Sequence, residues 1–180
     1  TLGLNHCLKL KTPQTEVVAG LSPVTMGRDA QCTLSIQAKT VSRFHAALYK
    51  FGKNFIIKDL HSTNGTFVNG LRKPQSPVVA GDVINLGDEV IEVWESNLEV
   101  PPYSNQCAVM FLNIYDYTNL YEKFGDYFSK YVKKILDMLQ DKVILKNGCP
   151  IKDLGAGLMI VFGLWPSSKG SAVEQALQFA

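Results

Sequence analysis

The chain has 180 residues, 46% of them hydrophobic, and its 18 basic and 16 acidic side chains leave a net charge of +2. This length can bury a sizeable core, in either one large domain or two small ones. Because no basic or acidic tail is present, the composition argues against non-specific binding to nucleic acid or to a membrane surface.

The cysteines and the longest apolar run exclude two further classes. Cys7, Cys32, Cys107 and Cys149 form no CxxC pair and have no histidine nearby at metal-ligand spacing. We interpret them as reduced apolar residues and expect no metal or cofactor. The run 154–165 contains three glycines and is too short to cross a bilayer. We therefore expect a soluble, cytoplasmic fragment of a longer protein, with no direct membrane insertion.

Up to Trp94, short β-branched and aromatic runs alternate with turn residues. Such spacing is typical of an all-β sandwich or barrel. Asn64-Gly65 and Asn69-Gly70 supply residues that tolerate a positive φ in turns. Nine strands are predicted, at residues 6–10, 17–18, 24–26, 33–36, 46–49, 55–58, 66–68, 83–85 and 89–94.

The segment 96–107 contains Pro101-Pro102 and has no apolar period. Proline pairs and the loss of periodicity are typical of a linker. We therefore predict two domains, at residues 1–95 and 108–180, on either side of it.

The second half has a different period. An apolar run at 109–114 predicts a strand, and Asp126 is predicted to begin a helix. A hairpin of 149–154 against 158–162 follows, and a further helix is predicted from near Ser171. The helix from Asp126 is expected to bury one face, made of Phe128, Val132, Ile135 and Leu139. This order is that of an incomplete α/β domain.

Three polar clusters of the first half are suited to bind a phosphorylated peptide. They are the runs 26–28, 41–46 and 59–70, which contain Met-Gly-Arg, Val-Ser-Arg-Phe-His-Ala and Asp-Leu-His-Ser-Thr-Asn-Gly-Thr-Phe-Val-Asn-Gly. Arginine offers a planar cationic fork for phosphate, and a serine hydroxyl adds a donor. An asparagine beside a turn can hold a peptide backbone.

These clusters, followed by Gly-Asp-Val-Ile-Asn-Leu-Gly at 81–87, resemble the full motif set of forkhead-associated (FHA) domains over residues 1–95. Each motif alone is common, but four in this order and spacing are specific. The resemblance implies an eleven-stranded β-sandwich of the SMAD/FHA type, with a binding site on loops at one end. Its expected partner is a phosphothreonine-containing protein.

The resemblance also implies a role for each matching residue. Arg28 and Ser42 would contact the phosphate, Arg43 and Thr63 would flank it, and Asn64 would hold the peptide main chain. The alternatives are an ordinary surface arginine at Arg28 and a turn residue at Ser42 that bonds its own backbone.

Three further residues are expected to support the site without touching the ligand. They are Gly27, His45 and Gly65, and His45 matches a buried histidine that supports the loop of Arg28 in the family. The family's preference for phosphothreonine over phosphoserine rests on one methyl group in a small apolar pocket, a contribution of about 0.8 kcal/mol.

The segments 109–118, 120–125 and 148–163 resemble the first half of a class III adenylate/guanylate cyclase domain, of ferredoxin-like fold. In that family two aspartates, one on the first strand and one in the hairpin turn, hold two metal ions. Here Asn113 and Ala156 stand in their places, so no metal is expected. Asp116 and Asp153 are the nearby acids, and neither is predicted as a ligand. Lys152 matches the family's adenine-selecting position.

The combined hypothesis is a phosphothreonine-binding adaptor, not an enzyme, whose degenerate cyclase-like domain mediates homodimer formation or hetero-association. The alternatives are a cyclase regulated by its FHA domain, or a subunit that supports an active cyclase partner through Lys152. The FHA loops could also bind an unphosphorylated partner or their own chain. An unrelated α/β fragment is the alternative for residues 108–180.

Overall fold

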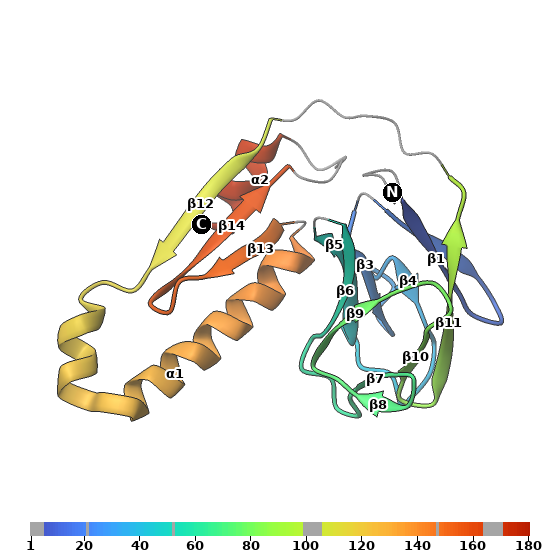
Figure 1. The fold of residues 1–180 in the computed structure, drawn as a ribbon, viewed down its shortest axis with the longest axis horizontal. Helices are drawn as coiled ribbons and strands as arrows, with labels where there is room; N and C mark the ends of the chain where they lie inside the picture. The colour runs from blue at the N-terminus through green and yellow to red at the C-terminus, as the bar shows by residue number, and fades with distance from the viewer. Residues whose placement is uncertain (1–5, 21, 52, 99–105, 147, 164–170) are drawn as a thin grey trace. The chain divides into compact units, whose positions relative to one another are not determined.

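The computed structural model describes residues 6–20, 22–51, 53–98, 106–146, 148–163 and 171–180, and only the backbone of Ile151 and Lys152. The chain divides into two compact units, Thr1–Tyr103 and Ser104–Ala180 (Figure 1). Most of the predicted linker, residues 99–105, lies outside the described residues.

The described residues of the first unit form eleven strands in two sheets. One sheet has the order β2-β1-β11-β10-β7-β8, and the other has the order β4-β3-β5-β6-β9. Neighbouring strands are antiparallel except β3 and β4, which are parallel. The strands are β1 (Cys7–Lys11), β2 (Glu16–Ala19), β3 (Val24–Gly27), β4 (Leu34–Ser35), β5 (Ala46–Phe51), β6 (Asn54–Asp59), β7 (Thr66–Val68), β8 (Leu71–Arg72), β9 (Gln75–Val78), β10 (Val83–Leu86) and β11 (Glu89–Ser96).

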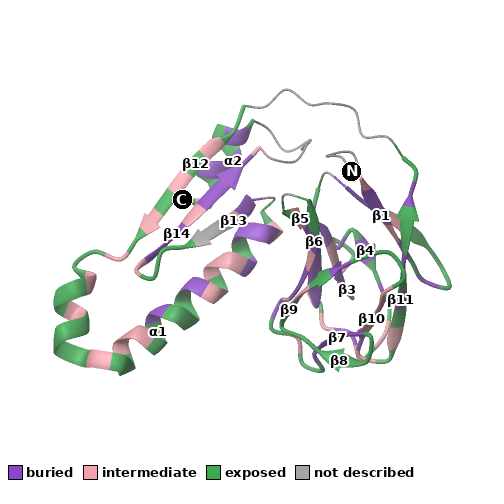
Figure 2. Ribbon diagram, viewed as in Figure 1, coloured by how far each residue is buried: buried purple, intermediate pink, exposed green. Residues whose placement is uncertain are grey.

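A single apolar core holds these two sheets together. Leu8, Ile84 and Ile91 from the first sheet pack with Leu48 and Ile57 from the second, and all five side chains are fully buried. Figure 2 colours the buried residues of the chain purple, and such residues occur along the strands of this unit. Alternate residues of each strand point inward because successive side chains of a strand face opposite sides of the sheet. The predicted all-β sandwich, with the eleven strands that the FHA resemblance implies, is confirmed.

Strands β8 and β9 were not among the strands predicted from the sequence. β8 is short and exposed, and β9 includes Pro77, which favours neither a strand nor a regular ladder. β9 exists because Phe55 to Lys58 of β6 pair with it at the edge of the sheet, where a missing N–H is tolerated.

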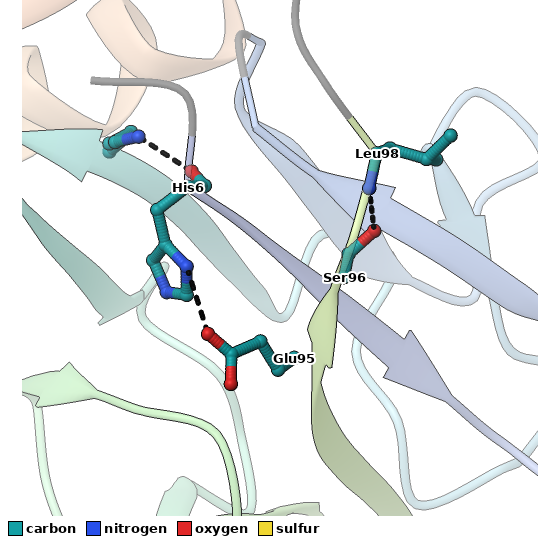
Figure 3. A network of polar contacts seen from close by, with 5 residues as sticks. His6, Glu95, Ser96 and Leu98 are labelled. Carbon is teal, nitrogen blue, oxygen red and sulfur yellow. Dashed lines mark hydrogen bonds and ion pairs between the residues drawn. The ribbon is translucent and has the colours of Figure 1, made fainter. Parts of the chain in front are cut away.

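Polar contacts tie the first strand to the last (Figure 3). His6 Nδ1 lies 3.6 Å from Glu95 Oε1, and the Lys50 ammonium donates to the His6 carbonyl at 2.6 Å. β11 continues through Ser96, which pairs with Cys7, and Ser96 Oγ then accepts a hydrogen bond from the Leu98 N–H. The last strand therefore extends one residue into the segment predicted as a linker.

Four connections meet at one end of the sandwich. β3 and β6 both run antiparallel to β5, so the loops after β3 and β6 lie at the end where β5 begins. β7 begins opposite the end of β10, which brings the β10–β11 turn to the same end. Register therefore gathers residues 26–28, residues 41–46 and the part of the third cluster up to Thr66 at one end of the core. Asn69 and Gly70, the last residues of that cluster, lie at the other end of β7.

In the second unit, the part of the chain that the structure describes forms a three-stranded antiparallel sheet and two helices. Val132, Leu136 and Val143 of the long helix pack with Leu158 and Ile160 of the central strand. The strand, helix, hairpin and helix order predicted for this half is therefore present. Its elements are β12 (Ala108–Asn113), α1 (Tyr117–Leu145), β13 (Gly148–Asp153), β14 (Gly157–Phe162) and α2 (Ala172–Phe179), and the sheet order is β12-β14-β13.

The long helix differs from the prediction in two ways. It begins at Tyr117, and the predicted start at Asp126 instead follows a break at Gly125, where φ is 59° and ψ is −145°. Ile135 is 43% exposed, whereas Leu136 is buried. Because each residue advances a helix by about 100°, Leu136 lies closer than Ile135 to the direction of Val132 and Val143.

Candidate functional site

Backbone hydrogen bonds hold the loop of Arg28 against the loop of Ser42. The Arg28 N–H donates to the Ser42 carbonyl at 2.9 Å, and the Asp29 N–H donates to the Arg43 carbonyl at 3.0 Å. Gly27 permits this approach, because a Cβ on Gly27 would collide with the carbonyl oxygen of Arg43. Gly27 therefore lets the two loops approach closely, and its support of a binding site stays a prediction.

The hydroxyl of Ser42 connects the second loop to the third. It accepts a hydrogen bond from the Thr63 N–H at 3.0 Å and donates to Thr63 Oγ1 at 3.4 Å. Ser42 is half-buried and Thr63 is exposed. Two residues that lie 21 positions apart in the chain therefore present neighbouring hydroxyl groups to solvent.

His45 is fully buried beneath these two loops. Its Nδ1 accepts a hydrogen bond from the Ser42 N–H at 3.1 Å, so Nε2 carries the proton and donates to the Gly65 carbonyl at 3.1 Å. Burial lowers the pKa of His45, while the Gly65 carbonyl and the charge of Asp59 oppose that shift. A neutral imidazole thus joins the loop of Ser42 to the loop of Gly65.

Asp59 orders the third loop from within. Its Oδ1 accepts from the Ser62 N–H at 2.9 Å, and its Oδ2 accepts from the hydroxyls of Ser62 at 2.5 Å and Thr66 at 2.7 Å. The Ser62 hydroxyl also accepts from the Gly65 N–H at 2.9 Å. His61 adopts a φ of 57° within this turn. The loop is therefore preorganised before any ligand arrives.

Asn64 is exposed at the tip of the same loop and is held from the side. Its amide nitrogen donates to the Thr40 carbonyl at 2.7 Å, and Thr40 Oγ1 accepts from the Asp88 N–H at 3.3 Å. The second amide hydrogen and the Oδ1 lone pairs of such a side chain remain available to a peptide backbone. The β10–β11 turn, through Asp88, thus helps to orient Asn64.

The two arginines of the site carry charge that no carboxylate neutralises within the described part of the chain. Arg28 and Arg43 are both exposed. Among the described residues, neither arginine takes part in an ion pair. Both lie on loops that backbone hydrogen bonds hold together, and one of these loops carries the Ser42 hydroxyl. Exposed guanidinium groups and hydroxyls on adjoining loops suit a dianionic phosphoryl group.

Sequence reasoning missed three residues of this network. Asp59 and Ser62 were seen only as parts of a motif, and Thr40 was not considered. An aspartate three residues before a serine is a recognisable turn signal, so the bond from the Ser62 N–H to Asp59 could have been expected. The bond from Asn64 to Thr40 spans 24 residues, and no local signal announces it.

The structure brings the two substituted positions of the second unit together. Asn113 pairs with Gly157 across the β12–β14 ladder, and the Ile114 N–H donates to the Ala156 carbonyl at 2.9 Å. The nearby Asp153 accepts from the Gly155 N–H at 2.7 Å and so caps its own turn. The predicted role of Lys152 depends on a side chain outside the described part of the structure.

Membrane-spanning helices and clusters of metal ligands are both absent from the described residues. No helix there combines the length and apolar character needed to cross a bilayer. In the same residues, no group of three or more histidine, cysteine or acidic side chains is placed to hold a metal ion.

Comparison with known proteins finds relatives for about half of the chain. The chain is 34% identical over 103 residues to vacuolar protein sorting-associated protein 64 of Saccharomyces cerevisiae, covering 53% of this chain and 17% of that protein. It is 32% identical over 80 residues to the FHA domain-containing protein FhaB of Mycolicibacterium smegmatis, covering 44% of this chain and 52% of FhaB. The chain therefore spans from less than a fifth to about half of these relatives.

A solved structure and a family model also match part of the chain. A chain from a structural and functional study of phosphothreonine-dependent FHA domain interactions is 27% identical, with a TM-score of 0.48, and the match covers 51% of this chain and 99% of that one. The family model of the FHA domain matches residues 24–87, which include all three site loops. Residues 24–87 of this chain are therefore an FHA domain.

Proposed function

We propose that the first unit binds a phosphothreonine in an extended peptide and that the protein acts as an adaptor. The observation that supports this proposal is the composition of two loops joined by backbone hydrogen bonds. They carry Arg28 and Arg43, which form no ion pair among the described residues, and Ser42, whose hydroxyl is bonded to Thr63. A phosphoryl dianion would supply the missing negative charge and accept hydrogen bonds from all four groups.

Each of the five proposed contact residues then has a task. Arg28 and Ser42 hold the phosphate, Arg43 and Thr63 flank it, and Asn64 binds the peptide main chain. Three residues would support the loops without touching the peptide. Gly27 allows the close backbone approach, and His45 bridges the Ser42 N–H and the Gly65 carbonyl. A rigid scaffold under exposed polar tips lowers the entropy lost on binding.

Peptide titration tests the proposal directly. Matched peptides carrying phosphothreonine, phosphoserine or unmodified threonine are titrated against the wild-type protein and Arg28→Ala by fluorescence anisotropy. Loss of a charged hydrogen bond should weaken binding by about 1.5–3 kcal/mol, or roughly ten- to a hundredfold. The threonine methyl should give phosphothreonine an advantage of about fourfold over phosphoserine.

A control variant separates the site from the overall charge of the protein. Lys53 is exposed in the turn between β5 and β6, at the opposite end of those strands from the site. Lys53→Ala removes the same charge as Arg28→Ala and should bind phosphothreonine peptides like the wild type. Equal binding of phosphorylated and unmodified peptides would contradict the proposal and favour an unphosphorylated partner or a segment of the same chain.

For the second unit, we propose a cyclase-like association domain without catalytic metals, which makes the protein a non-enzyme. The supporting observation is that an amide at Asn113 and a methyl at Ala156 lie next to each other where the resembled family has aspartates. Neither group is a good ligand for a hard divalent cation. Such a unit would pair with a second copy or with a related chain.

An activity assay distinguishes this proposal from the two catalytic alternatives. The purified protein, alone and mixed with a candidate cyclase partner, is incubated with ATP or GTP and manganese, and cyclic nucleotide is measured. No turnover by the protein alone is expected. Turnover that disappears in Lys152→Ala would contradict the proposal and favour a regulated cyclase or a supporting subunit.

The proposed location is the cytoplasm. The four cysteines are thiols that form no disulfide with one another, and three of them are buried. Burial raises the pKa of Cys32 to about 11 and that of Cys149 to about 12, so both thiols stay protonated and unreactive. Free thiols persist in a reducing compartment.

A further inference from the structure

Arg72, at the end of β8, reaches back over the loop that carries Thr63 and Asn64. It pairs with Phe67 in the β7–β8 ladder. A Cβ placed on Gly65 would lie 2.5 Å from Arg72 Nε, 3.0 Å from Cζ and 3.1 Å from Nη2. The guanidinium group therefore rests against the open face of the Gly65 backbone.

Gly65 gives this guanidinium a fixed support. Its φ is 84°, a conformation that favours glycine, and the residue is buried. Its carbonyl accepts from His45 at 3.1 Å and its N–H donates to Ser62 at 2.9 Å, so both polar backbone groups are already held. The Arg72 side chain thus lies on a part of the loop that is itself anchored.

The charge of Arg72 has no partner among the described residues. The residue is exposed, and the ion pairs of that part of the chain involve other side chains. The nearest acid of the loop, Asp59, already accepts three hydrogen bonds from Ser62 and Thr66. In the sequence, Arg72 follows Asn64, whereas Arg28 and Arg43 precede it.

The spacing along the loop limits the distance between Gly65, which lies under the Arg72 guanidinium, and Thr63. Gly65 follows Thr63 by two residues, which span at most about 7 Å. An extended peptide advances by about 3.3 Å per residue. A side chain about two residues from the phosphothreonine would therefore reach the guanidinium while the phosphate contacts Ser42 and Thr63.

We propose that Arg72 is a specificity-determining residue that selects an acidic side chain, aspartate or glutamate, about two residues from the phosphothreonine. This inference rests on the proposed phosphopeptide binding and adds a second recognised feature to it. The planar fork of arginine pairs with a carboxylate through two parallel hydrogen bonds, which lysine cannot reproduce. The exposed position predicts a modest gain in affinity and a clear effect on selectivity.

The test is a set of phosphothreonine peptides in which one position at a time, up to three residues on either side, carries glutamate or glutamine. Each peptide is titrated against the wild-type protein, Arg72→Gln, Arg72→Lys and Lys73→Gln. Glutamate at one position should bind the wild type about two- to fivefold more tightly than glutamine. Arg72→Gln should abolish that ratio, Arg72→Lys should reduce it, and Lys73→Gln should keep it.

The glutamine peptides distinguish recognition from support of the loop. If Arg72 only covered Gly65, Arg72→Gln would weaken the glutamate and glutamine peptides equally, and that outcome would overturn the proposal. An unchanged glutamate preference in Arg72→Gln would overturn it as well. Phosphate-dependent binding with no glutamate preference at any position would refute this inference and leave the proposed function standing. Binding without any phosphate dependence would refute both.

Discussion

The loops of the FHA unit and the hairpin of the second unit show two ways to close the end of a β-structure. In the first, side chains such as Asp59 and His45 join loops that are distant in sequence. In the second, Asp153 caps the turn that it belongs to, and the Ala156 carbonyl accepts from the Ile114 backbone. Hydrogen bonds between loops can hold exposed polar side chains in place. The hydrogen bonds of the hairpin order only the turn to which they belong.

The two ends also differ in how their charges are used. The site end exposes Arg28, Arg43 and Arg72, and no ion pair of the described residues involves them. The hairpin end presents the uncharged Asn113 and Ala156, and its Asp153 carboxylate accepts a hydrogen bond within its own turn. The proposed binding end therefore differs in carrying arginine charge that forms no ion pair among the described residues.

The largest expected difference between the two ends is in stability. Asp59→Ala removes the acceptor of three hydrogen bonds and should destabilise the first unit by about 3 kcal/mol. Asp153→Ala removes one exposed bond and should cost the second unit about 1 kcal/mol or less. Hydrogen exchange read by mass spectrometry reports the two units separately. Equal losses in both units would contradict the comparison.

A smaller effect is expected on affinity when the joined hydroxyls are separated. Ser42→Ala removes a proposed phosphate ligand and the acceptor of the Thr63 N–H. It should weaken phosphothreonine binding by about 1.5–2 kcal/mol, or roughly ten- to thirtyfold. Calorimetric titration measures this, with Ser76→Ala on β9 as the matched control. If both variants lose affinity alike, Ser42 has no special role.

The imidazole bridge predicts a pH dependence of the first unit. The pKa of His45 is lowered by burial, so the unfolded chain takes up a proton near the ordinary value of 6.5 while the folded protein does not. The free energy of unfolding should therefore fall as the pH drops below about 6.5, by at most about 1.4 kcal/mol per pH unit, until the lower folded pKa is reached.

Urea denaturation between pH 7.5 and 5 measures this slope for the wild type and His45→Gln. The variant should be less stable at neutral pH, because two loops lose their bridge, but its stability should depend less on pH in this range. An equal slope in both proteins would assign the pH dependence to other groups.

The smallest expected effect tests a local closure in the second unit. Ser171 caps α2: its hydroxyl accepts from the Glu174 N–H, and the Glu174 carboxylate accepts from the Ser171 N–H. Ser171→Ala should cost about 1 kcal/mol. Exchange protection should fall in α2 and stay unchanged in the FHA unit. A loss of protection in the site loops would show that the two units are coupled.

Local chemistry made much of this molecule readable from its sequence. Nine of the eleven strands follow from β-branched runs between turn residues, and Asn69 and Gly70 adopt the positive φ that an Asn-Gly turn predicts. The helix near Ser171 was predicted at its correct start. The motif order identified the FHA domain and its candidate residues, because the spacing of a complete motif set is carried by the chain itself.

Tertiary structure alone decided the features that join distant segments. β9 exists because β6 offers it a partner, and Ile135 rather than Leu136 is exposed because of the direction in which α1 packs. The tautomer of His45, the support of Asn64 by Thr40 and the position of Arg72 over Gly65 likewise depend on contacts between loops. A sequence records which groups are present, but the register of the sheets determines which of them meet.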